Sequence, residues 1–515
     1  MGSTQIIILG IIIAYLAMMV VIGVIYSKKT DNVGDFYLGG RTLGPIVTAM
    51  SAEASDMSSY LIMGLPGLAY FSGCSEVGWT IIGLFIGTYL NWLIVAKRLR
   101  IYSQKTGSIT IPDFFSDRYR DKSHVLMGIS AIIIIIFFIP YTGSGFAACG
   151  KLFTTLFGLD YHIAMIISAV VIVAYTCLGG FLAASTTDLI QSIVMTLALA
   201  VLVLYGVAHA GGMDAVIENA KSMQGYLSLT HGYDETTGNA TPFGFIPIVS
   251  TLAWGLGYFG MPHILLRFMA IRNKNEIKVS RRIASIWVII SMFVAMVIGI
   301  IGRQLSAEGF LRVFEGNADA ETLVVEMANK MSTHGVFLIL MAGLIFSGIL
   351  ACTMSTSDSQ LLAASSAMSE NLIGGLFGIK LSEKQKMVWA RIIVLLIAVL
   401  GIIIAWDPNS SVFRVVSFAW AGFGATFGPV MLTALFWKRS NKYGAIAGMA
   451  AGAVMIFVWK FIIRGLSPVL NIYELLPAFL VALVVIIVVS LCTAEPEKEI
   501  TEEFDSVAAE LKSAS

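Results

Sequence analysis

Charged residues are scarce in this chain of 515 residues. Asp, Glu, Lys and Arg make up 13% of it, and 33 basic against 32 acidic residues leave a net charge of +1. A nucleic-acid-binding protein would carry a basic face, whereas the basic residues here are spread over several loops. Hydrophobic residues supply 57% and the mean hydropathy is +0.84, which excludes a soluble globular domain. We expect a polytopic membrane protein.

Cysteines are also few, and nucleotide-binding motifs are absent. The five cysteines lie in or beside apolar segments and lack the spacing of a disulfide framework or a zinc site. No GxxxxGK[ST] motif occurs. No loop is long enough for a catalytic or signalling domain, so we expect no enzyme, and no repeated filter-like loop points to a channel. A secondary transporter is the class that remains.

Apolar segments of about 20 residues, long enough to cross a bilayer, recur along the chain. The sequence predicts an all-α protein with about thirteen transmembrane helices in one domain over residues 1–494, its core at about 44–437. An acidic tail, 495–515, is expected to be cytoplasmic and partly disordered or short-helical. The predicted spans are 5–26, 44–70, 75–96, 123–150, 161–178, 183–210, 244–268, 283–302, 335–368, 388–405, 411–436, 444–464 and 472–492.

The distribution of basic residues predicts the orientation. Lysines and arginines follow the spans 75–96 and 244–268, whereas the loop 211–242 has four acidic residues against Lys221 alone. Because cytoplasmic loops carry an excess of Lys and Arg, we expect the N-terminus outside and the C-terminus inside a cell (inner or plasma) membrane.

Two spans contain stretches that disfavour a regular helix. Ser51–Tyr60 (SAEASDMSSY) places Glu53 and Asp56 among small residues, and Trp254–Pro262 has three glycines and a proline. Irregular backbone at membrane depth is tolerated where it lines a cavity or is buried in protein. The two stretches lie five spans apart, which predicts two inverted five-helix repeats, spans 2–6 and 7–11, with peripheral helices outside them.

Polar residues inside other spans point to a bound cation. In Cys352–Gln360, Ser355, Asp358 and Ser359 share one helix face, and Thr186 to Asp188 add further oxygens. His263 and Arg267 are interpreted as interfacial or snorkelling residues near the inner end of their span. No clear basic residue lies in mid-span. The four acids inside the spans therefore favour bound cations or protonated carboxyls over internal salt bridges; they are Glu53, Asp56, Asp188 and Asp358.

Seven motifs resemble the sodium/solute symporter family, and together they extend over nearly the whole chain except the tail. They are FYLGGRTLGP (36–45), SAEASDMSSYLIMGLPG (51–67), TIPDFFSDRY (110–119), WGLGYFGMPHILLRFMA (254–270), MSTSDSQLL (354–362), AWAGFGATFGP (419–429) and FWKRSNKYGAIAGMAAG (436–452). The resemblance implies a LeuT-type core and import of a small amino acid, with proline expected, driven by Na+. The alternative is another small amino or carboxylic acid, with or without modulation by protons.

The resemblance also implies roles for individual residues. Sodium would be bound by the backbone carbonyls of Ala54 and Met57, the Cys352 carbonyl and the Ser355 and Thr356 hydroxyls. Residues linked to sodium or to a second cation are Asp56, Asp188, Asp358 and Ser359. Substrate would contact Ser55, Ser58, Tyr141, Trp254, Tyr258 and Pro262. Arg41 matches an arginine that the family uses in coupling. The partners implied are the solute, sodium and membrane lipid, with no nucleic acid and no obligatory protein partner.

Some residues depart from the pattern of the resemblance or have a second interpretation. Glu53 and Asp358 stand where small or hydroxyl residues are expected. Glu53 is either a protonated structural residue or a coupling residue that binds a proton. Tyr141 could fill a packing notch, and Trp254 with Tyr258 could belong to the core. For the last two, the resemblance favours contact with substrate.

Overall fold

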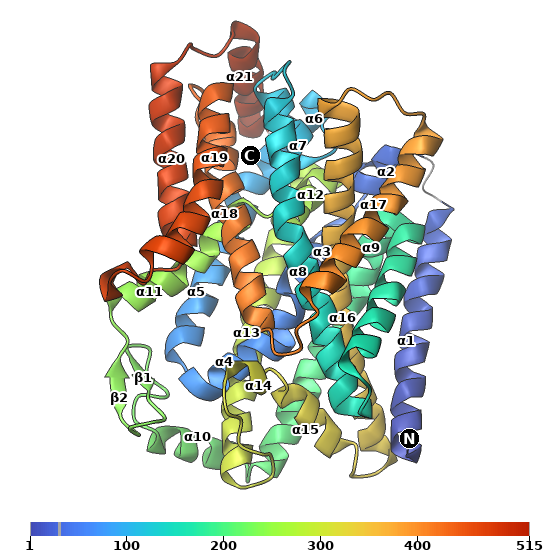
Figure 1. Ribbon diagram of the computed structural model, residues 1–515, viewed down its shortest axis with the longest axis vertical. Coiled ribbons are helices and arrows are strands. Elements are labelled where there is room, and N and C mark those ends of the chain that lie inside the picture. Colours follow the sequence, from blue (N-terminus) through green and yellow to red (C-terminus); the bar gives the residue numbers. More distant parts are fainter. Residues whose placement is uncertain (1, 29–31, 514–515) are drawn as a thin grey trace.

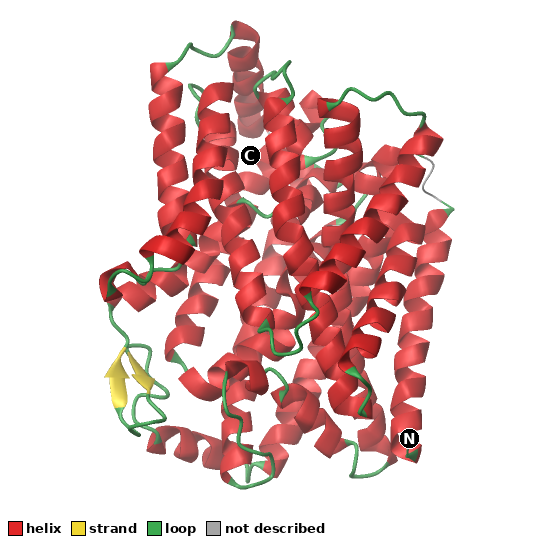
Figure 2. Cartoon of the chain, viewed as in Figure 1, coloured by secondary structure: helices red, strands yellow, loops and turns green. Residues whose placement is uncertain are grey.

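Helices form almost the whole molecule, as Figures 1 and 2 show. The computed structural model describes residues 2–28 and 32–513, so the last two residues of the predicted tail lie outside it. The long apolar helices are α1 (Ser3–Ser27), α5 (Ser75–Leu90), α8 (Val125–Phe157), α9 (Tyr161–His209), α13 (Ile277–Ala307), α16 (Val336–Ser366), α17 (Glu383–Ile404), α18 (Val412–Phe436), α19 (Lys442–Val458) and α20 (Leu475–Cys492).

Shorter elements connect these helices at the two ends of the bundle. They are α2 (Val33–Leu38), α6 (Ala96–Thr106), α7 (Ile111–Arg118), α10 (Met213–Ser222), α14 (Asn317–Ala320), α15 (Leu323–Met331) and the antiparallel strands β1 (His231–Tyr233) and β2 (Ala240–Pro242). Within the described residues, ten helices are long and apolar enough to cross a membrane, and one bent pair adds an eleventh. The chain is thus a multi-pass helical membrane protein.

Helix α9 is too long for one crossing. Its 49 residues extend about 74 Å at 1.5 Å per residue, more than twice the thickness of a hydrocarbon core. The helix breaks at Gly180, whose φ of 60° and ψ of −158° suit a residue without a side chain. At one end Tyr161 donates to the Ala405 carbonyl where α17 finishes, and at the other His209 contacts His334 where α16 begins. Both ends therefore lie on one face, and α9 forms two antiparallel arms.

Both interruptions expected in the spans are confirmed. The span that contains Ser51–Tyr60 divides into α3 (Pro45–Ser59), a π-helical turn and α4 (Leu65–Ser72). Within it Ser58 has φ 48° and ψ −171°, a conformation that non-glycine residues rarely adopt. The second consists of α11 (Phe245–Leu252), a 3-10 segment over Ala253–Phe259 and α12 (Pro262–Ala270), bent by 44°. Gly255 permits this path, because a Cβ there would lie 2.1 Å from the Gly83 carbonyl oxygen.

The two broken spans lie inside the molecule. Helix α16 packs along α9, α8 and α3, and α12 packs on α3 and α6. Helices α1, α19 and α20 lie at the edge of the bundle in Figure 1 and bury only part of their surface. Polar groups are therefore kept away from lipid in the interior between α3, α9, α12 and α16.

The acidic tail is ordered as far as it is described. Helix α21 (Lys498–Ser513) lies at the end of the bundle that also holds α6 and α7 (Figure 1), and its Val507 side chain is buried. Its carboxylates pair with basic residues of four connecting segments, namely Lys105, Arg120, Lys274 and Lys438. The sequence allowed either partial disorder or a short helix for this tail. In the structure the tail forms an amphipathic helix, which packs against the basic residues of these segments.

Candidate functional site

The break in α3 brings its backbone against α16. The Ser355 hydroxyl donates to the Ala54 carbonyl at 2.8 Å and to the Cys352 carbonyl at 3.2 Å. The Thr356 hydroxyl reaches the same Cys352 oxygen at 3.2 Å. All four residues are buried, and buried Met57 lies one turn after Ala54. Four of the five residues implied as sodium ligands thus form one oxygen cluster.

This oxygen cluster has the chemistry of a site for a hard monovalent cation. Its atoms are carbonyl and hydroxyl oxygens without formal charge, drawn from two different helices. Hard ions prefer oxygen ligands, and by extension a weakly charged oxygen set suits a single positive charge. The second arm of the break adds a contact, because the Cys352 thiol donates to the Ser58 carbonyl at 2.6 Å. A bound ion would therefore tie α3 to α16.

A small cavity of about 20 Å³ lies beside the oxygen cluster. Among the implied substrate residues, Ser58, Tyr141 and Trp254 line it, and so does Asp56. Ser55, Tyr258 and Pro262 do not. Tyr258 reaches the cavity indirectly, since its hydroxyl donates to Asp56 Oδ2 at 2.5 Å. Asp56 therefore belongs to the cavity wall in this structure.

The cavity also has lining residues that the site assignment did not include. Trp420 donates its indole N–H to the Trp254 carbonyl at 2.8 Å, and Tyr60 stacks on the Trp254 ring with centroids 5.8 Å apart. Trp420 stands inside the motif AWAGFGATFGP, so the motif was the available signal. The remaining residues of the wall are Met57, Leu84, Met292 and Val416, and apart from Met57 nothing in their sequence context distinguishes them from lipid-facing or core residues.

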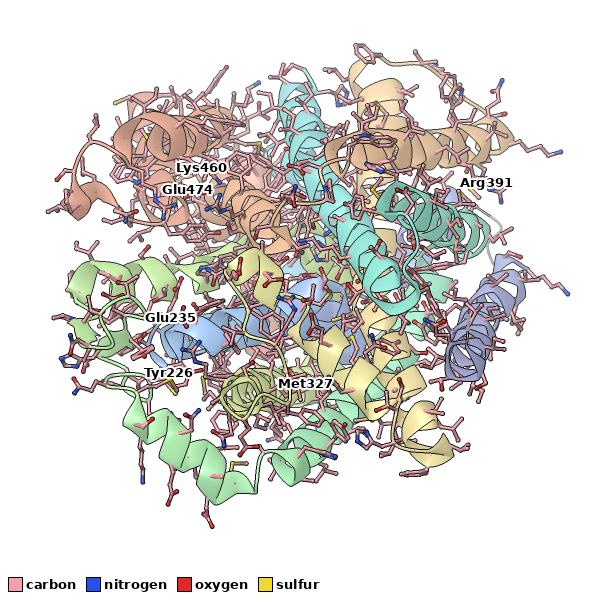
Figure 3. The ribbon with its side chains drawn as sticks, turned by 60° about the horizontal axis from the view of Figure 1, so that its bottom comes forward. Tyr226, Glu235, Met327, Arg391, Lys460 and Glu474 are labelled. Atoms are coloured by element: carbon pink, nitrogen blue, oxygen red, sulfur yellow. The ribbon has the colours of Figure 1, made fainter. Side chains whose placement is uncertain are left out.

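Trp254 separates this cavity from an outer one. A second cavity of about 440 Å³ is lined by the aromatic residues Trp254, Phe413 and Tyr473 and by charged residues, among them Lys460 and Glu474. Figure 3 shows these two residues on the neighbouring C-terminal helices, where they form an ion pair at 3.3 Å. Trp254 stacks on Tyr473 and packs against Phe413. The aromatic cluster is therefore a thin barrier between two spaces.

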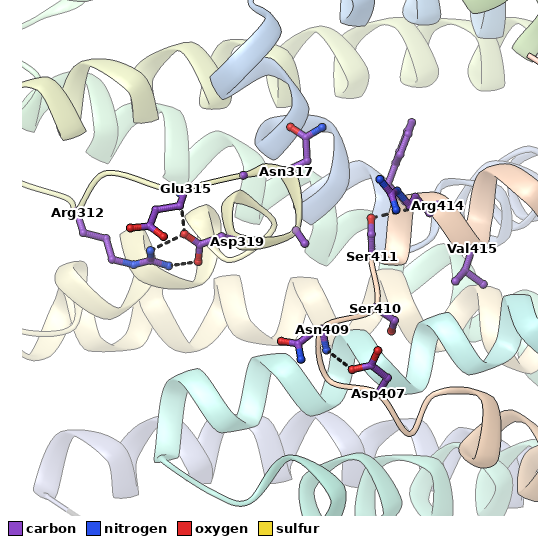
Figure 4. Close-up of a pocket in the computed structure, with 13 residues that line it drawn as sticks. Arg312, Glu315, Asn317, Asp319, Asp407, Asn409, Ser410, Ser411, Arg414 and Val415 are labelled. Carbon is purple, nitrogen blue, oxygen red and sulfur yellow. Dashed lines mark hydrogen bonds and ion pairs between the residues drawn. The ribbon is translucent and has the colours of Figure 1, made fainter. Parts of the chain in front are cut away.

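The outer cavity shares part of its wall with a third cavity. Phe413 and Arg414 line both it and a larger cavity of about 1110 Å³, shown in Figure 4. There Arg312 forms an ion pair with Asp319 of α14. Phe413 and Arg414 thus form a shared wall between the outer cavity and the larger cavity beside α14.

Glu53 lies apart from the cavity. Its Oε1 accepts the Trp92 indole N–H at 3.0 Å, whereas Oε2 has no hydrogen-bond partner within the described residues. The side chain is only 1% exposed. Neither interpretation of Glu53 is tested by this arrangement, and both stay predictions.

Arg41 lies at the end of the bundle near α6. Its guanidinium donates to the carbonyls of Ser103, Ser108 and Met269, and so joins the turn before α3 to α6 and α12. Burial and the neighbouring Arg100 lower the pKa of Arg41 to about 10, so it remains charged at neutral pH. The structure makes Arg41 a connector between elements at a distance from the cavity.

The interpretation of Arg267 as an interfacial or snorkelling residue is wrong. Arg267 is 1% exposed and its Nη2 lies 3.2 Å from Asp188 Oδ2 and 2.5 Å from Ser359 Oγ. The expectation that internal salt bridges are absent fails with it. The physical reason is the helix break: α12 begins only at Pro262, so Arg267 is still among other helices, as is fully buried His263.

The residues assigned to a second cation separate into two places. Asp188 and Ser359 contact Arg267, and Asp358 accepts from Ser359 at 3.1 Å and from Tyr175 at 2.9 Å. Asp56 is not part of this group and pairs with Tyr258 instead. The spacing on α16 correctly placed Asp358 and Ser359 together, but no sequence signal connected Arg267 to them.

Comparisons with known proteins find relatives that align with nearly the whole chain. The family model of the sodium:solute symporter family matches residues 36–452. The chain is 41% identical over 488 residues to the high-affinity proline transporter PutP of Bacillus subtilis (strain 168), covering 95% of this chain and 98% of the relative. It is 38% identical over 503 residues to a sodium/proline symporter of Staphylococcus aureus, covering 96% and 94%.

A solved structure is also similar. A sodium-coupled sialic acid symporter in a substrate-bound outward-open state superposes with a TM-score of 0.78 at 16% identity, covering 96% of this chain and 99% of that one. At this identity the likeness shows the fold alone, a LeuT-type transporter core.

Proposed function

The chain belongs to the sodium:solute symporter family, and from that premise we propose that it imports L-proline together with sodium by alternating access. The observation that carries the proposal is an aromatic-walled cavity directly beside a buried cluster of uncharged oxygens on the broken helix α3. The relatives named for proline transport align over nearly the whole chain. The protein is a transporter and not an enzyme.

The proposed architecture has thirteen crossings. They are the ten long helices, with α9 counted as two arms, together with the broken pair α3–α4 and the bent pair α11–α12. The inverted repeats then run from α3 to the end of α9 and from α11 to α18, with α1, α19 and α20 peripheral. We place the N-terminus outside and α21 in the cytoplasm, because the basic loops lie at the end of the bundle that α21 covers.

For sodium we propose the oxygen cluster of α3 and α16. The carbonyls of Ala54, Met57 and Cys352 and the hydroxyls of Ser355 and Thr356 would bind the ion. Ser355 Oγ and the Ala54 oxygen are already 2.8 Å apart, so a modest rotation of the hydroxyl turns both lone pairs toward one ion. Sodium would thus close α3 onto α16 and prepare the substrate cavity. At a membrane potential of about 100 mV, each sodium adds roughly 2.3 kcal/mol of driving free energy.

For proline we propose the cavity under Trp254. The apolar pyrrolidine ring would pack on Trp254, with Tyr141 and Ser58 beside it. Ser55 and Pro262 mark the broken helices, whose exposed N–H and C=O ends can bind the charged groups of an amino acid. Asp56, held by Tyr258, would fix the cavity wall. About 20 Å³ holds roughly one water molecule, so substrate binding has to move the aromatic barrier.

Coupling requires residues that respond to more than one state. We propose that Arg41 links movement of α3 and α12 to α6 at the cytoplasmic end, through its bonds to Met269 and Ser103. A second candidate function is sodium-coupled transport of another small amino or carboxylic acid, with protons modulating the transport. Glu53 supports it, because one oxygen of this buried carboxyl group has no hydrogen-bond partner within the described residues. Replacing Glu53 by Gln should abolish a pH dependence of uptake in that case and leave it unchanged otherwise.

The decisive experiment is uptake of labelled proline into proteoliposomes that contain only the purified chain and lipid. An inward sodium gradient should drive accumulation, an equal potassium gradient should not, and a negative interior should accelerate it. A panel of unlabelled amino and carboxylic acids then competes with proline. If sodium drives uptake of another solute but not of proline, the substrate proposal fails while family membership stands.

A further inference from the structure

Arg267 lies at the centre of a buried cluster where α3, α9, α12 and α16 meet. Its Nε donates to Ser51 Oγ at 3.0 Å, Nη1 to the His263 carbonyl at 2.9 Å, and Nη2 to Asp188 and Ser359. Ser51 also donates to Asp188 Oδ2 at 2.7 Å. Each nitrogen of the guanidinium therefore has an oxygen partner, and the side chain is held in one position.

The cluster lies next to the proposed sodium site. Ser51 precedes Ala54 by three residues on α3, and Ser359 follows Ser355 by four on α16. These offsets correspond to about one helical turn, or about 5.4 Å. The same two helices thus supply oxygens first to the sodium site and, one turn toward the cytoplasmic ends, to Arg267.

The oxygens around Arg267 are of the kind that would bind a sodium ion. They comprise a carboxylate from Asp188 and the hydroxyls of Ser51 and Ser359, all buried. A carboxylate in such surroundings requires a positive partner. The guanidinium supplies that charge permanently, because arginine is not deprotonated in proteins. The ring of Phe181, 5.0 Å from the guanidinium carbon, covers one of its faces.

We propose that the Arg267 guanidinium is a tethered cation that fills the second cation site of this transporter, so that one sodium ion is transported per substrate. The inference rests on the proposed function as a sodium symporter and deepens it by assigning the ion stoichiometry. The charge that a second ion would bring is built into α12, and it stays with the protein throughout the cycle.

Asp358 completes the assignment. Its two oxygens accept from the hydroxyls of Tyr175 and Ser359, so both are satisfied by neutral donors. Asp188 Oδ1, in contrast, has no hydrogen-bond partner in the described part of the chain. If the guanidinium is removed, Asp188 is therefore the carboxylate that a sodium ion would reach.

The test measures the ratio of ²²Na+ to proline flux and the Hill coefficient for sodium in proteoliposomes. The wild type and Asp358→Asn should both give values near one. Arg267→Gln removes the charge but retains hydrogen-bonding groups, and it should raise both values toward two with a higher sodium requirement. Arg267→Lys should stay near one. Neutralising the pair, Arg267→Gln with Asp188→Asn, should return the values to one.

Arg118→Gln is the matched control. Arg118 is also 1% exposed and donates to the Ala434 carbonyl, but it forms no ion pair in the described structure, so its loss should not alter the sodium ratio. A wild-type ratio of two, or a ratio of one in a folded Arg267→Gln protein, overturns the inference. If that variant does not fold, the wild-type, Arg267→Lys and neutral-pair ratios still decide. Absence of any sodium-driven proline uptake by the wild type would instead remove the proposed function.

Discussion

Replacing Ser355 by Ala tests the sodium site most directly. The Ser355 side chain is fully buried, and its hydroxyl oxygen lies 2.8 Å from the Ala54 carbonyl and 3.2 Å from that of Cys352. The change removes one ligand oxygen and leaves a buried carbonyl without its side-chain donor, at a cost of about 1–3 kcal/mol. If the loss falls on the sodium-bound state, the sodium concentration for half-maximal uptake should rise about 5- to 150-fold.

The assay is proline uptake at saturating proline over a range of sodium concentrations, with binding of labelled proline to detergent-purified protein as a second measure. Ser366→Ala is the control, because Ser366 lies on the same helix, is buried, and donates only to the Ala363 carbonyl of its own helix. The control should change the sodium requirement less than about twofold. Equal sodium requirements in Ser355→Ala and wild type would refute the site.

Three further predictions concern packing, pH and the tail. Gly255→Ala should destabilise the protein by about 1–3 kcal/mol through overpacking, seen as a lower Tm, whereas Gly465→Ala, with open space around it, should not. Burial raises the pKa of Asp113 to about 6, so the stability it contributes below that pH is lost as pH rises through 6; Asp113→Asn should remove this part of the pH dependence of Tm. Glu510→Gln breaks two part-exposed ion pairs and should cost less than about 1 kcal/mol, an effect that high salt in the wild type reproduces.

The interruptions of the membrane spans could be predicted because they depend on local chemistry. Small polar residues and carboxylates within Ser51–Tyr60, and glycines with a proline within Trp254–Pro262, weaken a helix wherever they occur. The oxygen cluster could also be predicted from the sequence, because it combines one such break with hydroxyl groups at helical spacing on α16. Of the predicted substrate residues, Ser58, Tyr141 and Trp254 line the small cavity, whereas Ser55, Tyr258 and Pro262 do not.

The placement of Arg267 could not be predicted in the same way. A continuous apolar span puts an arginine near its last residue at the membrane surface, where the long side chain reaches water. The break before Pro262 changes that depth, and only the packing of α3, α9 and α16 around α12 reveals that the guanidinium faces Asp188. The partners are 79 residues apart in the chain, so no local pattern connects them.

The sequence by itself determined the membrane setting, the family and the positions of the two helix interruptions, because hydrophobic length, motifs and helix-breaking residues are properties of short segments. Tertiary structure decided which polar groups meet. It separated Asp56 from Asp188, joined Trp254 to Phe413 and Tyr473 as a barrier, and gave Asp188 a guanidinium as its partner. These contacts join helices far apart in the chain, and the geometry that satisfies each buried charge arises only when the helices pack.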